Sequence, residues 1–532
     1  MNRRLPVFVV VFGAIAAMVV LADDPTGPHS ADVGSTGTEA FGLPIAESAD
    51  AQSSTWFCAG GTGIESETAF ADHTVIVANA SDDDVVGTLT VYAGSIREAV
   101  SGEDQLDDID SSSTTETSET TETTEAPATP EPVTQQLEVP ALARIEIRLG
   151  DVIPAELVSA VVEMPSGAIA VEHRVESVNG FDTAPCASNA AVDWHFAWGA
   201  TTDDAREVLV FFNPFADDAV VDGSFITDDG PREPGRFDGL VIPAGSVVGL
   251  DLGDDVTIRP QIAASLRLRS GRVIVDRIQR FDGSDGPKGL TVRLGMTQPK
   301  PVWIFPDGLV DEGVRETIHL FNPTDRSAEV LIDIAPDDPA TNGIPEPFEV
   351  SVQPGAQIAV DLGADGRVEP GVGHSAIVRV VNDGAVVAER VLRSSSPSER
   401  SGVSVATGSP VAASRWVFAG GGTSESQDEF LYVLNPSNEF LATFSIVALE
   451  DGQRLDVQGL TDLEVPPAGR LAIRVGSQIE RDVALLVESS SPIVVERGLY
   501  AVEGPGVSNA IGIPFAGDLI EPPPFIDDTA GG

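Results

Sequence analysis

Basic residues are scarce in this chain. Its 532 residues include 83 acidic side chains against 31 lysines and arginines, which gives a formal net charge of −52. Only two of the basic residues are lysines, Lys288 and Lys300. A surface with this charge repels phosphate backbones and anionic lipids, so the composition argues against nucleic-acid binding. Lysine-based nucleophilic chemistry also has little to draw upon.

Motifs for catalysis and metal binding are missing as well. No Gly-x-Ser-x-Gly elbow, P-loop or Gly-x-Gly-x-x-Gly follows an expected strand. The histidines are not spaced as paired zinc ligands: His29, His73, His173, His195, His319 and His374. The acidic loops at residues 251–255 and 361–365 lack the dense oxygen spacing of a calcium loop, so we interpret them as turns. We therefore expect no enzymatic activity, no cofactor and no metal.

Cysteine is limited to Cys58 and Cys186. In an oxidising compartment this pair predicts one disulfide that joins the two ends of the first domain. Closing such a long loop would stabilise the fold by ~4–5 kcal/mol in the chain-entropy treatment. Two free thiols are the alternative, which is less expected outside the cell.

A long apolar run occurs only at the N-terminus, where Arg3 and Arg4 precede residues 5–22. The run ends in a sequence suitable for signal cleavage, after Ala22, and is also nearly long enough to remain as a transmembrane helix. Both interpretations, signal peptide and membrane anchor, predict export to the cell surface or secretion. Residues 23–52 are rich in Gly, Ser, Ala, Asp and Pro and are expected to form a flexible stalk.

The chain does contain a repeat. An aromatic strand with a Gly-containing loop opens four times, at Trp56, Trp194, Trp303 and Trp416. The last three lie 109 and 113 residues apart, and an Asn-Pro dipeptide follows at the same spacings, at Asn213, Asn322 and Asn435. Asn79-Ala80 is the weaker version in the first copy. A period near 110 residues fits a whole β-domain.

Within each copy, short strands alternate apolar and polar residues and are separated by Gly, Pro, Asn and Asp. The sequence thus predicts an all-β fold of four tandem antiparallel β-sandwich repeats, of about 110 residues each, after an N-terminal hydrophobic helix. The expected domains are a signal or anchor (1–22), the stalk (23–52), repeats at 53–192, 193–300, 301–413 and 414–516, and an acidic tail (517–532).

The first repeat carries an insertion at residues 101–136 whose centre is a run of Thr and Glu. No packed core can form from this composition, so we expect a disordered acidic loop. It is either a protruding, O-glycosylated brush or simply an insertion tolerated at a hairpin tip, because loop entropy grows slowly with length.

Each repeat also has an acidic residue followed by a basic one on a late strand. The four pairs are Glu172-His173, Asp276-Arg277, Glu389-Arg390 and Glu496-Arg497. Adjacent strand residues point to opposite faces, so we expect one member to face the core or a neighbouring domain and the other to face solvent. General acid-base chemistry needs a second converging group, which no repeat supplies, so a structural ion pair is favoured.

The recurring tryptophans are interpreted as core anchors rather than exposed platforms for sugars. Trp198 occurs in one copy only and is the better candidate for an exposed contact.

The complete unit is clearest in the fourth copy: Trp416-Val-Phe-Ala-Gly-Gly, Leu434-Asn-Pro, Val465-Pro-Pro-Ala-Gly-Arg and Ser491-Pro-Ile-Val-Val-Glu-Arg. It resembles a module of uncharacterised exported proteins of actinobacteria, a domain of unknown function. More distantly it resembles the single-domain β-sandwich of the sensory rhodopsin transducer family, whose units assemble around a fourfold axis. The resemblance implies a fold and no reaction. Four linked copies could form such a ring or an extended rod.

These observations predict a non-enzymatic scaffold or interaction protein, exported or tethered to the membrane, that binds an unknown protein or glycan at the cell surface. A carbohydrate- or cell-wall-binding module is the main alternative, for which exposed aromatic residues would speak. A hydrolase with a site between domains is a remote alternative.

Overall fold

The computed structural model describes residues 42–64, 70–97 and 130–522. These residues are almost entirely β-structure, arranged in several sheets, so the all-β prediction is confirmed. The predicted N-terminal helix, most of the stalk, residues 98–129 of the insertion and residues 523–532 of the tail lie outside the described residues. Among the described residues, no helix is long and apolar enough to cross a membrane.

We refer to residues 53–192, 193–300, 301–413 and 414–516 as segments 1 to 4. Each segment contributes an inner sheet of four antiparallel strands. In spatial order these are β5 (Ala143–Arg148), β2 (Asp72–Asn79), β7 (Ile169–Ser177) and β8 (Gly180–Pro185) in segment 1; β14 (Ser246–Asp251), β10 (Ala205–Asn213), β16 (Ile274–Phe281) and β17 (Gly289–Leu294) in segment 2; β22 (Ala356–Asp361), β19 (Val314–Asn322), β24 (Val387–Ser394) and β25 (Gly402–Thr407) in segment 3; and β31 (Arg470–Arg474), β27 (Gln427–Leu434), β32 (Ala484–Ala501) and β33 (Val507–Ile511) in segment 4.

Each segment also has an outer sheet that begins with its tryptophan strand. The outer strands are β1 (Ser54–Cys58), β6 (Leu157–Met164), β3 (Val85–Arg97) and β4 (Val133–Val139); β9 (Asp193–Phe196), β15 (Ile262–Ser270), β11 (Ala219–Thr227), β12 (Gly230–Arg232) and β13 (Leu240–Ile242); β18 (Val302–Phe305), β23 (His374–Val380), β20 (Ala328–Pro336) and β21 (Phe348–Val352); and β26 (Ala412–Phe418), β28 (Ala442–Glu450), β29 (Gln453–Asp456), β30 (Leu463–Val465), β34 (Ile513–Pro514) and β35 (Leu519–Ile520), which pair around the first half of β32.

Helical structure within the described residues is limited to single turns. They are the α-helical turn α2 (Pro339–Asn342) and the 3-10 turns η2 (Leu149–Asp151), η3 (Gly235–Phe237), η4 (Leu252–Asp254), η5 (Val475–Ser477) and η6 (Ala516–Asp518).

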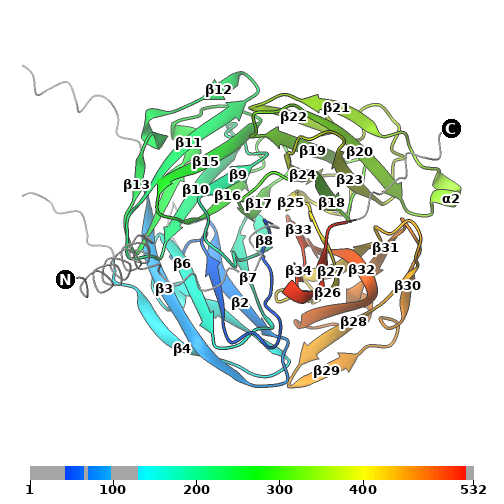
Figure 1. Ribbon diagram of the computed structural model, residues 1–532, viewed down its shortest axis with the longest axis horizontal. Coiled ribbons are helices and arrows are strands. Elements are labelled where there is room, and N and C mark those ends of the chain that lie inside the picture. Colours follow the sequence, from blue (N-terminus) through cyan, green and yellow to red (C-terminus); the bar gives the residue numbers. More distant parts are fainter. Residues whose placement is uncertain (1–41, 65–69, 98–129, 523–532) are drawn as a thin grey trace, which may run out of the picture. The chain divides into compact units, whose positions relative to one another are not determined.

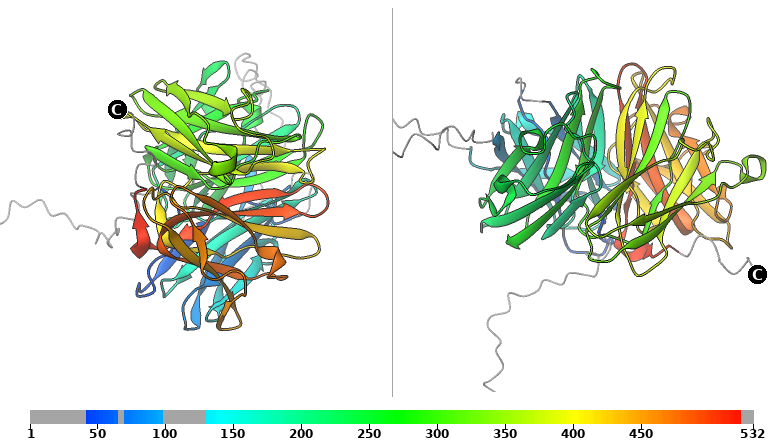
Figure 2. Two further views of the ribbon diagram at one scale, coloured as in Figure 1. Left: turned by 90° about the vertical axis from the view of Figure 1, so that its right-hand side faces the viewer. Right: turned by 90° about the horizontal axis from the view of Figure 1, so that it is seen from above.

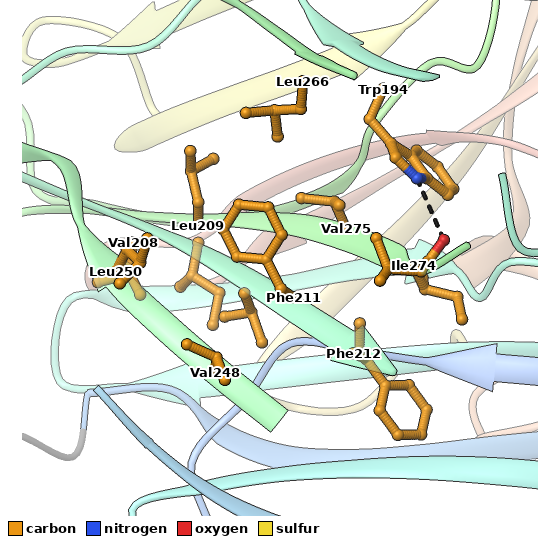
Figure 3. Packing of buried hydrophobic residues seen from close by; sticks show 14 of the residues in the cluster. Trp194, Val208, Leu209, Phe211, Phe212, Val248, Leu250, Leu266, Ile274 and Val275 are labelled. Carbon is orange, nitrogen blue, oxygen red and sulfur yellow. Dashed lines mark hydrogen bonds between the residues drawn. The ribbon is translucent and has the colours of Figure 1, made fainter. Parts of the chain in front are cut away.

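Burial follows the two kinds of sheet. The outer strand β11 alternates buried and less buried residues, as expected for a sheet with one face toward solvent. The inner strand β10 is buried continuously from Glu207 to Asn213, so both of its faces are covered. One face forms the core between the two sheets, where Phe211 and Val275 pack with Trp194 and Leu266 (Figure 3). The other face adjoins neighbouring segments.

The closing strands of the four inner sheets contact one another in a cycle: β8 with β17, β17 with β25, β25 with β33, and β33 with β8. In Figure 1 the groups of strands follow one another in colour order, and the red strands of segment 4 lie beside the blue and cyan strands of segment 1. The two further views show the same neighbours (Figure 2). The described residues from 42 to 522 therefore belong to one compact unit.

The outer sheet of segment 1 is also continuous with the inner sheet of segment 2. Residues 94–97 of β3 pair in parallel with residues 247–250 of β14. Gly94 is needed at this junction, because a Cβ atom there would lie 2.2 Å from the carbonyl oxygen of Val247. Pairing with the next segment extends β3 to Arg97.

Three predicted boundaries also need correction. Residues 42–52 are not flexible stalk, since Ile45 and Ala46 are buried and the backbone of Ala46 pairs with Pro514 and Ala516. The insertion does not extend to residue 136, because β4 begins at Val133 and pairs with β3. The first residues assigned to the tail belong to the fold, since β35 pairs with β26. In each case, backbone hydrogen bonds to a distant strand order a segment whose composition alone suggests a loop.

Candidate functional site at the contacts between segments

The recurring tryptophans anchor the core of each segment. Trp56, Trp194, Trp303 and Trp416 are each at most 1% exposed. The indole N–H of Trp194 donates to the carbonyl of Val273 at 3.2 Å, and that of Trp303 donates to Val386 at 2.7 Å. The indole thereby fastens the first outer strand to the start of a late inner strand, while its rings fill the space between sheets.

The recurring asparagines hold the turn after the second strand of each inner sheet. Asn322 Nδ2 donates to the carbonyls of Arg326 and Val352, and its Oδ1 accepts the backbone N–H of Thr324. Asn213 and Asn435 make the corresponding bonds. Asn79 does the same in segment 1, although Ala80 replaces the proline. The asparagine, rather than the proline, therefore carries the turn.

The acidic and basic pairs meet between segments. We call the contact between two segments a seam and number it by its segments. At seam 2–3, Arg277 donates to both carboxylate oxygens of Glu389, at 2.9 and 3.2 Å. At seam 3–4, Arg390 donates to both oxygens of Glu496, at 2.6 and 3.1 Å. Each bond joins the basic residue of one segment to the acidic residue of the next.

Seam 4–1 closes the cycle in the same way. Arg497 donates to both oxygens of Glu172, at 2.9 and 3.0 Å. These two residues are 325 positions apart in the sequence. The last and first segments therefore meet through the same kind of bidentate pair that joins segment 2 to 3 and segment 3 to 4.

A backbone N–H completes every clamp. The amide at the fifth position of each tryptophan motif donates to the acidic residue of the recurring pair in the next segment. The four donors are Gly60 to Asp276, Trp198 to Glu389, Asp307 to Glu496 and Gly420 to Glu172. The motif loop and the late strand of one segment thus grip a single carboxylate of the next.

Seam 1–2 differs from the other three because its cation is replaced by histidine. His173 Nε2 lies 3.8 Å from Asp276 Oδ2, beyond hydrogen-bonding distance. His173 Nδ1 is instead 3.0 Å from Nε2 of His73. Asp276 therefore lacks the bidentate guanidinium partner that the other three acids have.

A second buried carboxylate stands behind each arginine. Glu207, Glu316 and Glu429 occupy one recurring position on the second inner strand, six residues before its asparagine, and each is at most 1% exposed. Burial raises the pKa of Glu207 to about 8 and that of Glu429 to about 7, against the lowering effect of the arginine of the same segment. His73 holds this position in segment 1. Sequence reasoning missed the position, although its spacing from the asparagine was readable.

The buried acid or histidine at this recurring position explains why the tryptophan motif ends in glycine. A Cβ atom at Gly199 would lie 2.2 Å from the carboxylate of Glu207, and one at Gly421 would lie 2.5 Å from that of Glu429. A Cβ at Gly61 would lie 2.3 Å from His73. The motif needs glycine there because the buried acid or histidine occupies the space of a side chain.

Two expectations about exposure were wrong. Both members of every acidic-basic pair are buried, at 2% exposure or less. Each late inner strand lies between two neighbouring segments, so its acid faces one of these segments and its base faces the other. Trp198 is 2% exposed rather than available for contact. It stacks on Phe281 and lies near His319 of the next segment, so it fills seam 2–3.

One further ion pair joins all four segments where the closing strands meet. Arg293 on β17 lies 2.7 Å from Asp182 on β8 and donates to the backbone carbonyls of Val405 on β25 and Asn509 on β33. The corresponding residue on the other three closing strands is alanine: Ala184, Ala406 and Ala510. Beside this pair is a mainly apolar cavity of about 60 Å³, lined by all four closing strands and by Leu43 and Pro44.

The predicted disulfide is confirmed: Cys58 and Cys186 are bonded. In the other segments the same two places hold a phenylalanine and a glycine in contact. A Cβ atom at Gly408 would lie 2.9 Å from the ring of Phe305. The disulfide of segment 1 therefore stands where the other segments pack an aromatic ring on a bare backbone.

Comparisons with known proteins give a family match over part of the chain and no activity. A family described as a family of unknown function (DUF5719) matches residues 133–289. No curated protein matches the sequence.

Two solved structures show limited likeness. The chain in the crystal structure of Thermotoga maritima 1070 is 19% identical in sequence. The match covers 94% of that chain and 21% of this one, with a TM-score of 0.19. The native conformation of E. coli alpha-2-macroglobulin is 10% identical, with 89% of this chain and 31% of that chain covered and a TM-score of 0.12.

Proposed function

We propose that this protein is a non-enzymatic scaffold, exported or tethered to the membrane, in which four tandem β-sandwich repeats close into a ring and present their loops to a partner. The observation that carries the proposal is the cycle of four seams. At each seam a backbone N–H donates to the carboxylate of the next segment, and at three of the four an arginine binds the same carboxylate. Repetition of one contact around a closed cycle is how identical subunits form rings.

The seams support a rigid scaffold. A buried charge is costly unless it is paired and hydrogen-bonded, and removing one partner of a buried pair costs about 3–5 kcal/mol. Movement of one segment away from the next would separate such a pair at each affected seam, for example Arg390 from Glu496. The ring would therefore hold its loops in a fixed arrangement, which favours binding through loops on a rigid support.

The distribution of exposed apolar side chains fits this use. Val178 lies in the turn between β7 and β8 and is 86% exposed. Phe440 and Leu441 follow each other in the loop between β27 and β28 and are 65% and 47% exposed. We propose the loop of Phe440 and Leu441 as one contact region, because two adjacent exposed apolar residues form a larger patch than single ones.

The alternatives have less support. A carbohydrate-binding function was expected to use Trp198, which is buried in seam 2–3. A hydrolase between domains would need an accessible acid. The acids of the seams, such as Glu207 and Asp276, are enclosed between segments and are at most 2% exposed.

Export can be tested on intact cells that produce the protein. Treatment with an external protease should cleave it, and a maleimide mass label should react with Cys58 and Cys186 only after reduction, because an oxidising compartment forms the bond. Protection from protease together with thiols that react without reduction would overturn the exported location.

Partner binding needs a separate experiment. The purified protein should sediment with isolated cell envelopes, and Phe440→Ser with Leu441→Ser should weaken sedimentation. A matched control is Val502→Ser, another exposed apolar loop residue. Protease treatment of the envelopes distinguishes a protein partner from a glycan. The absence of sedimentation with intact and protease-treated envelopes would contradict a scaffold that acts at the cell surface.

A further inference from the structure

The hydrogen bonds at seam 1–2 fix the protonation of its two histidines. His73 Nδ1 lies 2.8 Å from the carbonyl oxygen of Val158, which can only accept, so Nδ1 carries a proton. In neutral His73 the other nitrogen, Nε2, is then an acceptor, and it faces Nδ1 of His173 at 3.0 Å. His173 must therefore donate from Nδ1. The pair is satisfied as long as one of the two facing nitrogens, Nε2 of His73 or Nδ1 of His173, carries no proton.

Protonation of both rings breaks this arrangement. After one proton, His173 can carry its own proton on Nε2 and accept the N–H of His73 through Nδ1. After a second proton, the N–H at Nε2 of His73 faces the N–H at Nδ1 of His173, so an attractive contact between two rings 5.1 Å apart becomes a repulsion between two donors. Both rings are fully buried and cannot turn toward water. Solvent access, and with it a second proton, requires that segment 1 move away from segment 2.

We propose that seam 1–2 is an acid-sensitive joint, which opens when His73 and His173 take up protons while the other three seams stay closed. The proposal rests on the contacts of this seam and does not depend on the identity of any partner. The parallel pairing of β3 with β14 and the chain itself still connect the two segments, so the opening is local.

The charges around the histidines permit one extra proton but not two. From β16, Asp276 faces the free Nε2 of His173 and accepts the N–H of Gly60. From β17, Arg293 faces His173 and is itself paired with Asp182 of β8. From β2, Asp72 adds a weak attraction for a proton on His73. One carboxylate therefore faces two imidazoles and a guanidinium.

Burial has opposite effects on these groups. It lowers the pKa of His73 to about 4 and that of His173 well below its usual value, with His73 and Arg293 adding to the second effect. It raises the pKa of Asp276 to about 7, against the backbone N–H groups of Gly60 and Ala59. A lowered histidine pKa gives stability that is present above pH 6.5 and lost as the pH falls, whereas the raised pKa of Asp276 acts in the opposite direction.

The net effect is acid opening. When the seam opens below pH 6.5, the two histidines take up two protons and Asp276 releases one, so one proton is taken up overall. The opening equilibrium should then rise by about five- to tenfold for each pH unit between pH 6 and pH 4. At seam 4–1, the raised pKa of Glu429 has the reverse sign, so acid favours the closed state there. At seam 2–3, the raised pKa of Glu207 also has the reverse sign and offsets the pKa of His319, which burial and the nearby arginines lower to about 3.

Hydrogen exchange of single amides in the purified full chain tests the proposal. The amide of Gly60 reports on seam 1–2, and the equivalent amides of Trp198, Asp307 and Gly420 report on the other seams in the same sample. After correction for the intrinsic exchange rate at each pH, protection at Gly60 should fall between pH 6 and pH 4. Protection at the other three amides should stay constant or rise.

Two variants separate the joint from a general acid effect. His73→Gln can keep both hydrogen bonds but cannot be protonated, so the fall in protection at Gly60 should disappear. The triple variant His73→Glu, His173→Arg, Asp276→Glu rebuilds the chemistry of the other seams and should behave like them. An equal fall at all four amides, no fall at Gly60, or an unchanged fall in His73→Gln would each overturn the proposal.

Discussion

Removing the cation of one seam should destabilise the protein far more than removing a surface arginine. Arg390→Met leaves the carboxylate of Glu496 buried without its bidentate partner, since both side chains are fully buried. Breaking a buried pair in this way costs about 3–5 kcal/mol. Arg315→Met is the matched control, because Arg315 lies in the same segment and pairs with Asp361 at a side-chain exposure of 67%. We expect that control to cost less than about 1 kcal/mol.

A double-mutant cycle measures the interaction between Arg390 and Glu496 itself. Gln at position 496 can still accept the backbone N–H of Asp307, which lies 2.9 Å from the carboxylate of Glu496. Combining Glu496→Gln with Arg390→Met should therefore recover part of the loss, with a coupling energy of about 2 kcal/mol between the two sites. Equilibrium urea denaturation followed by tryptophan fluorescence measures each free energy of unfolding, because all five tryptophans are buried.

Two results would refute this reasoning. If Arg390→Met costs no more than Arg315→Met, the guanidinium of Arg390 is hydrated and segments 3 and 4 are not closed on each other. If the double variant is as unstable as the sum of the single variants, the two side chains do not interact. Either result would remove the main support for a rigid ring.

Three further predictions concern other recurring positions. The double variant Cys58→Phe, Cys186→Gly should rebuild the contact between phenylalanine and glycine that the other segments have. It should melt at a higher temperature than the double variant Cys58→Ser, Cys186→Ser, which should lose up to about 5 kcal/mol of stability. Equal melting temperatures would contradict the idea that the disulfide takes the place of this contact. Asn322→Ala should cost about 2–3 kcal/mol in urea denaturation, because two backbone carbonyls lose their donor, whereas the exposed Asn342→Ala should cost under about 1 kcal/mol. Glu207→Gln should flatten the pH dependence of stability: with its pKa raised to about 8, wild-type stability falls by up to about 1.4 kcal/mol per unit as the pH rises from 5 to 8. Parallel slopes for wild type and variant would show that Glu207 is ionised in the folded protein.

Sequence reasoning succeeded where the cause of a feature is local. Alternation of apolar and polar residues is a direct consequence of strand geometry, so the all-β fold could be predicted. The disulfide could be predicted because two cysteines leave one intramolecular pairing. The recurrence of Asn322 and its equivalents marked a turn, and the structure shows the hydrogen bonds that make it one.

Sequence reasoning failed where a residue's surroundings come from another segment. Trp198 was expected at the surface because it occurs in one copy only, yet its ring is covered by Phe281 and by the next segment. The acid-base pairs were expected to be half exposed, since the alternation of a strand says nothing of what covers its second face. The extension of β3 to Arg97 likewise depends on β14, more than a hundred residues away.

By itself, the sequence determined the strand periodicity, the recurrence of one unit, the single sulfur bond and the strongly negative charge, because each of these depends on residue type and short-range spacing. Only the tertiary structure decided which charges meet. Glu172 binds Arg497, which is 325 positions away in the sequence, because the last strands lie against the first. His173 faces Asp276 without a hydrogen bond. The pairing partner of a buried charge is fixed by the geometry of packed sheets, which spacing along the chain does not encode.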